Sequence, residues 1–414
     1  MKLTSSNTFR LLKEKGLGEA VKHRLDRILG ENIFIDLFVP IAWNLGLKMP
    51  KGCKFVYISS HGTGHNAMLR FLVRCGIFTN YYYLESGYVR YNGIYKRLIK
   101  DHKQYNIISI SERNFKDDKK FFSSITEKMP ALVLVRDPIS VLKSGLNLHV
   151  GWSDKGKTIY GGGGGQASLS SSLDLDIEIN PPPIEKLDGI ATKDYNIQGI
   201  FITTEIIESL PNLTDLHYID TNEITGARTF DTLNRLAGIF GFTPPKERHY
   251  FEGVLYGNLR PFMPLRFLVP YKGKDGHLEL VCTIMQAGEL KGLVNVTSKL
   301  RPKHYEEDKD FSHVAIYVDG SSLCHLEDSG FVEFVRANLD SLFIALRQGI
   351  ERVNAKKISE KEVLDYLRER PSLALSLKGL LDRELKLVKQ KRPDLVQSWK
   401  HYLEFERLCK EFGS

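Results

Sequence analysis

A short segment near the start of the chain, Ser59–His65 in FVYISSHGTGHNAML, combines two glycines with hydroxyl and imidazole side chains. An apolar run precedes it and a run with helical spacing follows, so it reads as a turn between a strand and a helix. The first N–H groups of a helix attract anions, and glycines let the chain turn tightly beside them. The pattern therefore predicts a phosphate-binding loop, although this loop lacks the lysine of GxxxxGK[ST]. An ordinary strand-to-helix turn is the alternative.

A second polar group follows another apolar run. VLVRDPISVLKSGLN contains Arg136, Asp137 and Pro138, and Ser144 comes after five further residues. Arg136 lies at the carboxyl end of a predicted strand, where ligands gather in open α/β sheets. Ser144 lies about two turns into the helix that Pro138 begins, so a guanidinium and a hydroxyl can face one phosphate. The alternative is a capping aspartate, a proline at a helix start and a surface arginine.

These two segments resemble the nucleotide-binding motifs of sulfotransferases that use 3′-phosphoadenosine 5′-phosphosulfate (PAPS). In that family a strand–loop–helix, usually of PKSGTT type, wraps the 5′-phosphosulfate, and an R-[ND]-P-x5-S segment grips the 3′-phosphate. RDPISVLKS matches the second motif in residue type and spacing, and LHYIDTNEITGARTFDTLNRLAGIFGF resembles a later family block. The resemblance covers residues 53–260. The rest of the chain resembles uncharacterised bacterial proteins with such a front half.

The resemblance implies a role for each matching residue. Arg136 and Ser144 would hold the 3′-phosphate, and the 5′-phosphosulfate would rest on Ser59, Ser60, His61, Gly62, Thr63, Gly64, His65 and Asn66. The chain departs from the family at Ser60, where a lysine or arginine normally touches the leaving phosphate. His61 or His65 could supply the missing proton or charge, because a neighbouring dianion favours a protonated imidazole. Otherwise transfer is slow, or the site only binds nucleotide.

Sulfuryl transfer also needs a base for the acceptor proton, and it needs no catalytic metal. In the family this base is a histidine or glutamate just after a strand between the two phosphate motifs. Glu112, which follows YNIISIS, is the first candidate, and a solvated carboxylate paired with Arg113 or Lys116 is the alternative. His102 and Glu85 are the second and third candidates. His102 follows a lysine-rich helical stretch, which is also typical of a surface residue.

Tyrosines are concentrated between the two motifs, and these rings could stack on sugar rings or on adenine. The tyrosines are Tyr81, Tyr82, Tyr83, Tyr88, Tyr91 and Tyr95. Aromatic side chains are also ordinary core residues, which is the alternative for about half of them.

The elements that position these residues predict an α/β fold with a parallel-sheet, P-loop-like core. Residues 1–50 form an N-terminal segment, with an amphipathic helix expected over residues 8–29. Residues 51–245 form the nucleotide-binding core, interrupted at 160–186 by a Gly-, Ser- and Pro-rich insertion that could act as a lid. A disordered insertion with no role is the alternative. Residues 246–414 form a C-terminal region of antiparallel strands followed by helices, whose leucine stripes predict packing against the core or a second subunit.

The composition restricts the ligands and the cellular compartment that can be expected. The net charge of +8 suits anionic ligands but does not indicate nucleic acid, and five widely spaced cysteines fit a reducing compartment. No secretory signal is recognisable at the start. The apolar run 32–47 is too short to span a bilayer and contains Asp36 and Pro40, so a buried or interfacial segment is expected. We expect a cytoplasmic protein, with a peripheral contact to the inner membrane face left open.

The function that these features favour is transfer of a sulfuryl group from PAPS to a hydroxyl or amine of a glycan or another cell-surface acceptor. The glycine run 161–165 supports that acceptor class, because a guanine tract in the gene would permit slippage that switches bacterial surface structures. Two alternatives remain. One is a P-loop kinase or nucleotide phosphotransferase, and the other is an inactive nucleotide-binding scaffold of the same fold.

Overall fold

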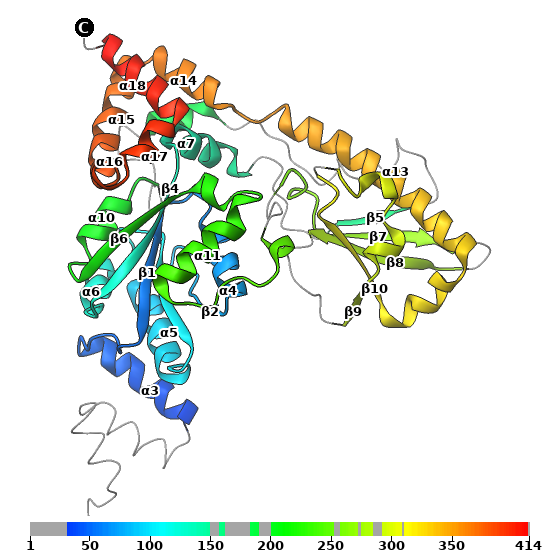
Figure 1. Cartoon of the computed structure of the whole chain (residues 1–414), viewed down its shortest axis with the longest axis horizontal. Coiled ribbons are helices and arrows are strands. Elements are labelled where there is room, and N and C mark those ends of the chain that lie inside the picture. Colours follow the sequence, from blue (N-terminus) through cyan, green and yellow to red (C-terminus); the bar gives the residue numbers. More distant parts are fainter. Residues whose placement is uncertain are drawn as a thin grey trace, which may run out of the picture.

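The computed structural model describes residues 31–149, 157–161, 183–189, 200–251, 257–271, 275–284, 292–308 and 310–412. Within these residues the chain forms two bodies, each built around a five-stranded sheet (Figure 1). The helix expected over residues 8–29 and most of the insertion expected at 160–186 lie outside the described residues.

The first sheet is parallel throughout, with strand order β2-β3-β1-β4-β6. Its strands are β1 (Cys53–Ser59), β2 (Ile77–Phe78), β3 (Tyr105–Ile110), β4 (Met129–Val135) and β6 (Leu213–Asp220). The helices around it are α3 (Glu31–Asn44), α4 (His65–Arg74), α5 (Gly87–Lys100), α6 (Asp118–Ser124), α7 (Pro138–Leu146), α10 (Thr203–Glu208) and α11 (Arg228–Phe240). The mainly parallel sheet predicted from the alternation of strands and helices is thus confirmed.

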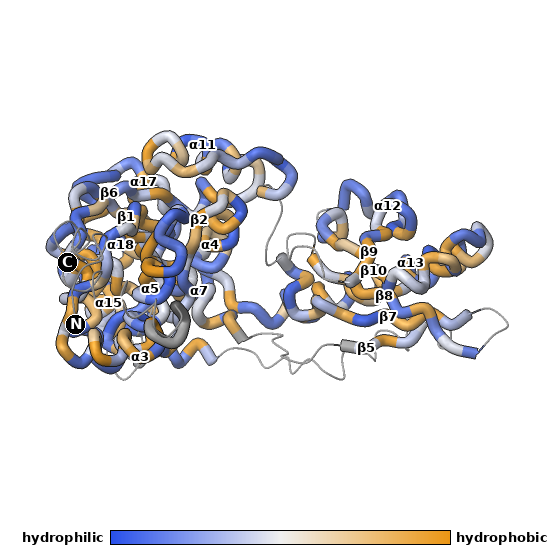
Figure 2. The backbone as a smooth tube through the Cα atoms, turned by 90° about the horizontal axis from the view of Figure 1, so that it is seen from below, coloured by the Kyte–Doolittle hydropathy of each residue, from blue (hydrophilic) through white to orange (hydrophobic). Residues whose placement is uncertain are grey.

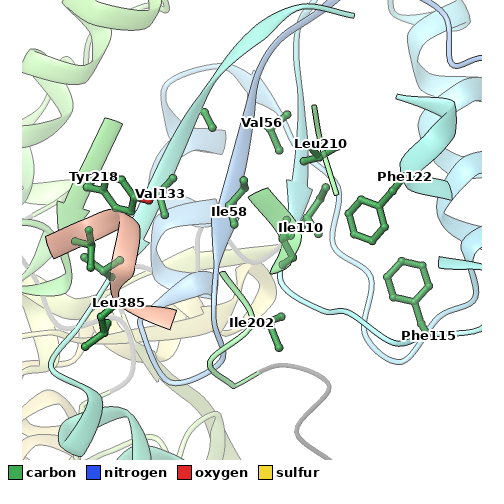
Figure 3. Packing of buried hydrophobic residues seen from close by; sticks show 14 of the residues in the cluster. Val56, Ile58, Ile110, Phe115, Phe122, Val133, Ile202, Leu210, Tyr218 and Leu385 are labelled. Atoms are coloured by element: carbon green, nitrogen blue, oxygen red, sulfur yellow. The ribbon is translucent and has the colours of Figure 1, made fainter. Parts of the chain in front are cut away.

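Both faces of this sheet are covered, because successive residues of each strand enter different apolar clusters. Phe55 and Tyr57 of β1 belong to the cluster that α4 and α11 complete. Val56 and Ile58 belong to the larger cluster on the other face. Figure 3 shows strand residues of this larger cluster together with Ile202, Leu210 and Leu385 from later segments. Burial on both faces explains why the strands read as continuous apolar runs rather than alternating ones.

The second sheet has the order β5-β7-β8-β10-β9 and is antiparallel except where β5 meets β7. Its strands are β5 (Lys157–Tyr160), β7 (Leu265–Pro270), β8 (His277–Ile284), β9 (Leu293–Asn295) and β10 (Val314–Asp319). The short helix α12 (Thr297–Leu300) and the long helix α13 (Ser329–Asn354) accompany them, and α13 buries its apolar side in the cluster of this sheet. Figure 2 shows β7, β8, β10 and α13 together at one end of the molecule.

After α13 the chain returns to the first body, where five C-terminal helices pack on the parallel sheet (Figure 1). They are α14 (Glu360–Arg368), α15 (Pro371–Glu384), α16 (Lys386–Lys391), α17 (Pro393–Ser398) and α18 (Lys400–Phe412). Residues 246–414, expected as one C-terminal region, therefore contribute to the apolar clusters of both bodies. The leucine stripe of α15 faces the core through Leu373, Leu377 and Leu381.

Helix α3 contains the apolar run that the sequence marked as buried or interfacial. Val39 and Trp43 are buried against the parallel-sheet body, while Leu37 and Ile41 on the opposite side are exposed. No helix among the described residues combines the length and the apolar character needed to cross a bilayer.

Asp137 joins the C-terminal helices to the parallel-sheet body. Its Oδ1 accepts a hydrogen bond from the Ile139 N–H of α7 at 2.9 Å. Its Oδ2 accepts hydrogen bonds from the N–H groups of His401 and Tyr402, at 3.0 and 3.2 Å, in the first turn of α18. One buried carboxylate thus caps two helices that lie more than two hundred positions apart in the sequence.

We predict that Asp137→Ala lowers the free energy of unfolding by about 1–4 kcal/mol, because each lost cap costs about 0.5–2 kcal/mol. Asp137→Asn keeps one oxygen acceptor and should lose less. Asp215→Ala is the control, since Asp215 is exposed on β6. Urea denaturation measures all three variants, and equal stability of Asp137→Ala and Asp215→Ala would contradict the double cap.

Candidate functional site

The segment between β1 and α4 forms a tight bend at the carboxyl edge of the parallel sheet. Gly62 and Gly64 both have positive φ, at +83° and +96°. A Cβ on Gly62 would lie 3.2 Å from the Val141 carbonyl oxygen and 3.3 Å from the Val141 side chain. Gly62 therefore has two reasons to be glycine: the backbone conformation and the close approach of α7. We call residues 60–64 the glycine bend.

Arg136 and Ser144, predicted to act with this bend, both reach it. β1 and β4 pair in register, with Ser59 opposite Leu134, so Arg136 emerges beside the bend. Arg136 Nη1 donates hydrogen bonds to the Gly62 carbonyl oxygen at 2.7 Å and to Ser144 Oγ at 2.8 Å. Burial lowers the pKa of the Arg136 guanidinium, while Glu360, Asp220 and Asp137 act in the opposite direction. An arginine stays protonated under these influences, so the bend has a permanent positive charge beside it.

The third sequence block also contacts the bend. Thr221, which follows β6, donates from Oγ1 to the Thr63 carbonyl oxygen at 2.5 Å and to the Val135 carbonyl oxygen at 3.1 Å. Asp220 beside it accepts from the Trp399 indole N–H at 2.6 Å and from the Asn222 N–H at 2.7 Å. The three blocks quoted from the sequence thus meet at one place.

The buried side chains of Ser59 and His65 stabilise the bend from the core side. Ser59 Oγ and His65 Nδ1 are 2.6 Å apart in the core, and the His65 ring stacks on Tyr57. Burial lowers the pKa of His65 to about 3. His65 is therefore neutral near pH 7, and the positive charge or proton expected from it is not available.

The remaining residues of the bend differ in exposure. Ser60 is buried and its Oγ lies 3.0 Å from Thr203 Oγ1. Its hydroxyl thus stands at the position where the sulfotransferases that this chain resembles have a lysine or arginine. Thr63 Oγ1 donates to the Ser60 carbonyl oxygen at 2.6 Å. Asn66 is exposed in the first turn of α4, and Gly64 gives that helix no side-chain cap. No side chain among the described residues is seen to cap the first N–H groups of α4, and a ligand or water can bind there.

Glu112 lies on the other flank of the bend, because β3 pairs with β1 and Ile110 is opposite Ile58. Its side chain is only 1% exposed and forms an ion pair with Arg90, which is 2% exposed. Both Glu112 oxygens also lie 3.1 Å from the donating Leu84 N–H. Glu112 is thus buried and occupied, rather than solvated and paired with Arg113 or Lys116.

His61 is the partly exposed member of this group. Its Nε2 lies 3.7 Å from Glu112 Oε1, and its ring stacks with Tyr83 at 5.7 Å. Burial lowers the pKa of His61 below its ordinary value, with Glu112 raising it and Arg90 lowering it. His61 is therefore mainly neutral at pH 7 and able to accept a proton.

The other candidate bases lie elsewhere. His102 is exposed in the turn before β3, and so stands at the amino edge of the sheet, opposite the glycine bend. Glu85 is exposed, and its carbonyl oxygen accepts from Arg90 Nε at 2.9 Å. Neither side chain contacts the bend.

Sequence spacing does not indicate several of these contacts. Arg90 has no sequence signature beyond a helical spacing, and Thr203 contacts Ser60 from a distant segment. Glu384 caps the short helix α10 by accepting from the N–H groups of Thr203 and Thr204, at 2.8 and 3.1 Å. Burial raises the pKa of Glu384 to about 7. No group of three or more His, Cys, Asp or Glu side chains within the described ranges is arranged to hold a metal ion.

Comparison with known proteins gives one match. A family model described as "Protein of unknown function (DUF2972)" matches residues 218–412. No curated protein and no solved structure matches the chain. The matched range begins in β6 and includes most of the second sheet and the C-terminal helices, so it contains Asp220, Thr221 and Glu384 but not the glycine bend.

A GxxxxGK[ST] pattern does occur away from the bend, at 151–158. Its lysine and threonine begin strand β5, whereas a phosphate loop of that type must lead into a helix. Residues 151–156 lie outside the described part of the chain. The glycine bend therefore remains the candidate phosphate site.

We predict that Glu112→Gln lowers the free energy of unfolding by about 3–5 kcal/mol, because Arg90 is left buried without a counter-charge. The double variant Arg90→Met, Glu112→Gln should lose less than the sum of the two single variants. Glu369→Gln is the control, since Glu369 is exposed and its partner Arg370 is only partly buried. If Glu112→Gln unfolds at the same urea concentration as this control, the buried pair has no structural role.

Proposed function

We propose that this protein is a cytoplasmic sulfotransferase that moves a sulfuryl group from PAPS to a hydroxyl or amine of a glycan or another cell-surface molecule. The observation that supports it is the contact of Arg136 with both the Gly62 carbonyl and the Ser144 hydroxyl. RDPISVLKS, which resembles the 3′-phosphate motif of PAPS-dependent enzymes, therefore lies against the bend that would hold the other end of the nucleotide.

The donor is held by charge and by backbone amides in this proposal. Arg136 presents Nη2 and Nε to the 3′-phosphate, because its hydrogen bonds to Gly62 and Ser144 both use Nη1. Ser144 adds a hydroxyl, and the uncapped first turn of α4 receives the 5′-phosphosulfate. Because position 60 is serine rather than lysine, the leaving 5′-phosphate depends on these backbone amides.

The transfer step assigns separate roles to His61 and Glu112. The acceptor oxygen forms a bond to sulfur as the bond from sulfur to the bridging phosphate oxygen breaks. The acceptor proton goes to His61 Nδ1, and 3′-phosphoadenosine 5′-phosphate (PAP) leaves with the electron pair. Glu112, whose oxygens are occupied by Arg90 and Leu84, positions His61 and favours its protonated form as the proton arrives.

The kinase alternative has less support. A nucleotide phosphotransferase needs a carboxylate at a strand end to hold magnesium. The two carboxylates that follow β4 and close β6, Asp137 and Asp220, are engaged in helix capping and in a bond to Trp399. An inactive scaffold would bind the nucleotide without transferring the sulfuryl group, so a turnover assay with PAPS tests this alternative.

We predict that PAP binds more tightly than ATP, as measured by titration calorimetry. Arg136→Ala should weaken PAP binding roughly ten- to hundredfold, because hydrogen bonds to charged groups contribute about 1.5–3 kcal/mol. Ser144→Ala should weaken it roughly two- to tenfold. Arg368→Ala, an exposed arginine of α14, is the control and should not change it. A preference for ATP, or unchanged PAP binding in Arg136→Ala, would falsify the donor assignment.

We further predict a pH dependence set by His61. The neutral imidazole is the active base, so the rate is full above its pKa and falls as the pH drops through it. Because burial lowers this pKa, that fall should come below pH 6.5, the ordinary value for histidine. Release of PAP from PAPS with p-nitrophenyl glycosides as acceptors measures the profile. His61→Gln should lower the rate and remove the acidic limb; a limb that survives in this variant assigns the base elsewhere.

A further inference from the structure

A tyrosine-rich segment, TNYYYLES (Thr79–Ser86), connects β2 to α5 and runs beside the glycine bend. Two buried contacts hold it. Asn80 and Ser109 exchange hydrogen bonds, with the Asn80 side chain donating to the Ser109 carbonyl at 2.8 Å and accepting from its N–H at 2.9 Å. Leu84 adopts a positive φ of 55° and donates its N–H to Glu112. A non-glycine residue in this conformation is strained, and its hydrogen bond to Glu112 holds it there. Glu112 therefore fixes the path of this segment in addition to positioning His61.

The tyrosines of this segment divide by alternation. Tyr82 points inward, and a Cβ on Gly93 would lie 1.8 Å from its hydroxyl, so the Tyr82 side chain would have to shift if residue 93 were larger. Tyr81 and Tyr83 are 56% and 52% exposed. Their rings lie 6.1 Å from His65 and 5.7 Å from His61, respectively. The exposed ring of Tyr83 thus lies beside the candidate base His61, and the exposed ring of Tyr81 lies beside His65. We call Tyr81 and Tyr83 the tyrosine pair.

The tyrosine pair lies on the side of the bend away from the donor-binding residues. β1 is central, with β4 on one side and β3 on the other. Arg136 and Ser144 follow β4, whereas Asn80 and Leu84 anchor the pair to residues at and just after the end of β3. A nucleotide whose 3′-phosphate reaches Arg136 extends toward β4, which leaves the β3 side for the acceptor.

We propose that the tyrosine pair binds a neutral sugar ring of the acceptor and presents one of its hydroxyls to His61; this inference rests on the proposed function. The apolar C–H face of a sugar packs on an aromatic ring, and the phenol hydroxyls can bond to sugar hydroxyls. Glu85 is the one charged residue in TNYYYLES, and it is acidic. Arg90, which contacts this segment through the Glu85 carbonyl, is buried and paired with Glu112. The segment therefore offers an anionic acceptor no counter-charge.

The experiment compares Tyr81→Ala, Tyr83→Ala and Tyr83→Phe with wild type, using p-nitrophenyl glycosides of glucose, galactose and N-acetylglucosamine as acceptors. We expect KM for a glycoside to rise about tenfold in each alanine variant and to stay within about twofold in Tyr83→Phe, which keeps the ring. The Kd for PAP should not change. Tyr160→Ala, an exposed tyrosine of β5, is the control. Circular dichroism melts verify that each variant is folded.

The other outcomes overturn the inference in distinct ways. Weaker PAP binding in Tyr83→Ala would place adenine on the pair. Transfer by the wild type to 2-naphthol but to no glycoside would make the acceptor an aromatic alcohol, and unchanged KM in both alanine variants would remove the pair from acceptor binding. If the wild type does not bind PAP, the proposed function fails first. Saturation-transfer NMR with the same glycosides then tests the inference by itself. A sugar signal that is seen with wild type and lost in the alanine variants supports sugar binding. Absence of that signal with wild type overturns the inference.

Discussion

The hydrogen bonds of Arg136 to Gly62 and Ser144 depend on the parallel register of β1 and β4. Ser59 lies opposite Leu134, so both strands end at the same edge and the bend meets the guanidinium. A shift of one residue would turn the Arg136 side chain to the other face of the sheet, because strand side chains alternate. Val141 adds a second constraint, since a Cβ on Gly62 would lie only 3.2 Å from its carbonyl oxygen. Strand register, bend and helix α7 therefore define one geometry together.

Much of this geometry follows from sequence, and the reason is physical. Buried parallel strands read as apolar runs, and residues that follow such strands gather at one sheet edge. That is why Arg136, Glu112 and Thr221, taken from three separate segments, lie around one bend. The strands and helices quoted from the sequence in residues 53–240 match β1, β3, β4, β6, α4, α7 and α11 closely.

Pairing between distant segments was not predictable in the same way. The alternative drawn from sequence neighbours paired Glu112 with Arg113 or Lys116, yet Arg113 pairs with Asp118 and Glu112 pairs with Arg90. His61 and His65 are only four positions apart. His65 is buried and bonded to Ser59, so it stabilises the bend, whereas His61 stays accessible. Neither the partner nor the exposure of a polar side chain is encoded in local spacing. Both depend on which helix packs over the strand end.

The C-terminal helices belong to the same physical unit as the glycine bend. Glu360 accepts from Ser140 and pairs with Lys143 on α7, and Asp137 caps α18. Trp399 is 1% exposed and donates to Asp220, next to the threonine that contacts the bend. Residues 218–412 exclude β4, which pairs with β6, and they exclude the β1, β3 and β4 residues of the apolar cluster that contains Trp399. The part of the matched range that belongs to the first body is therefore packed on strands that precede that range.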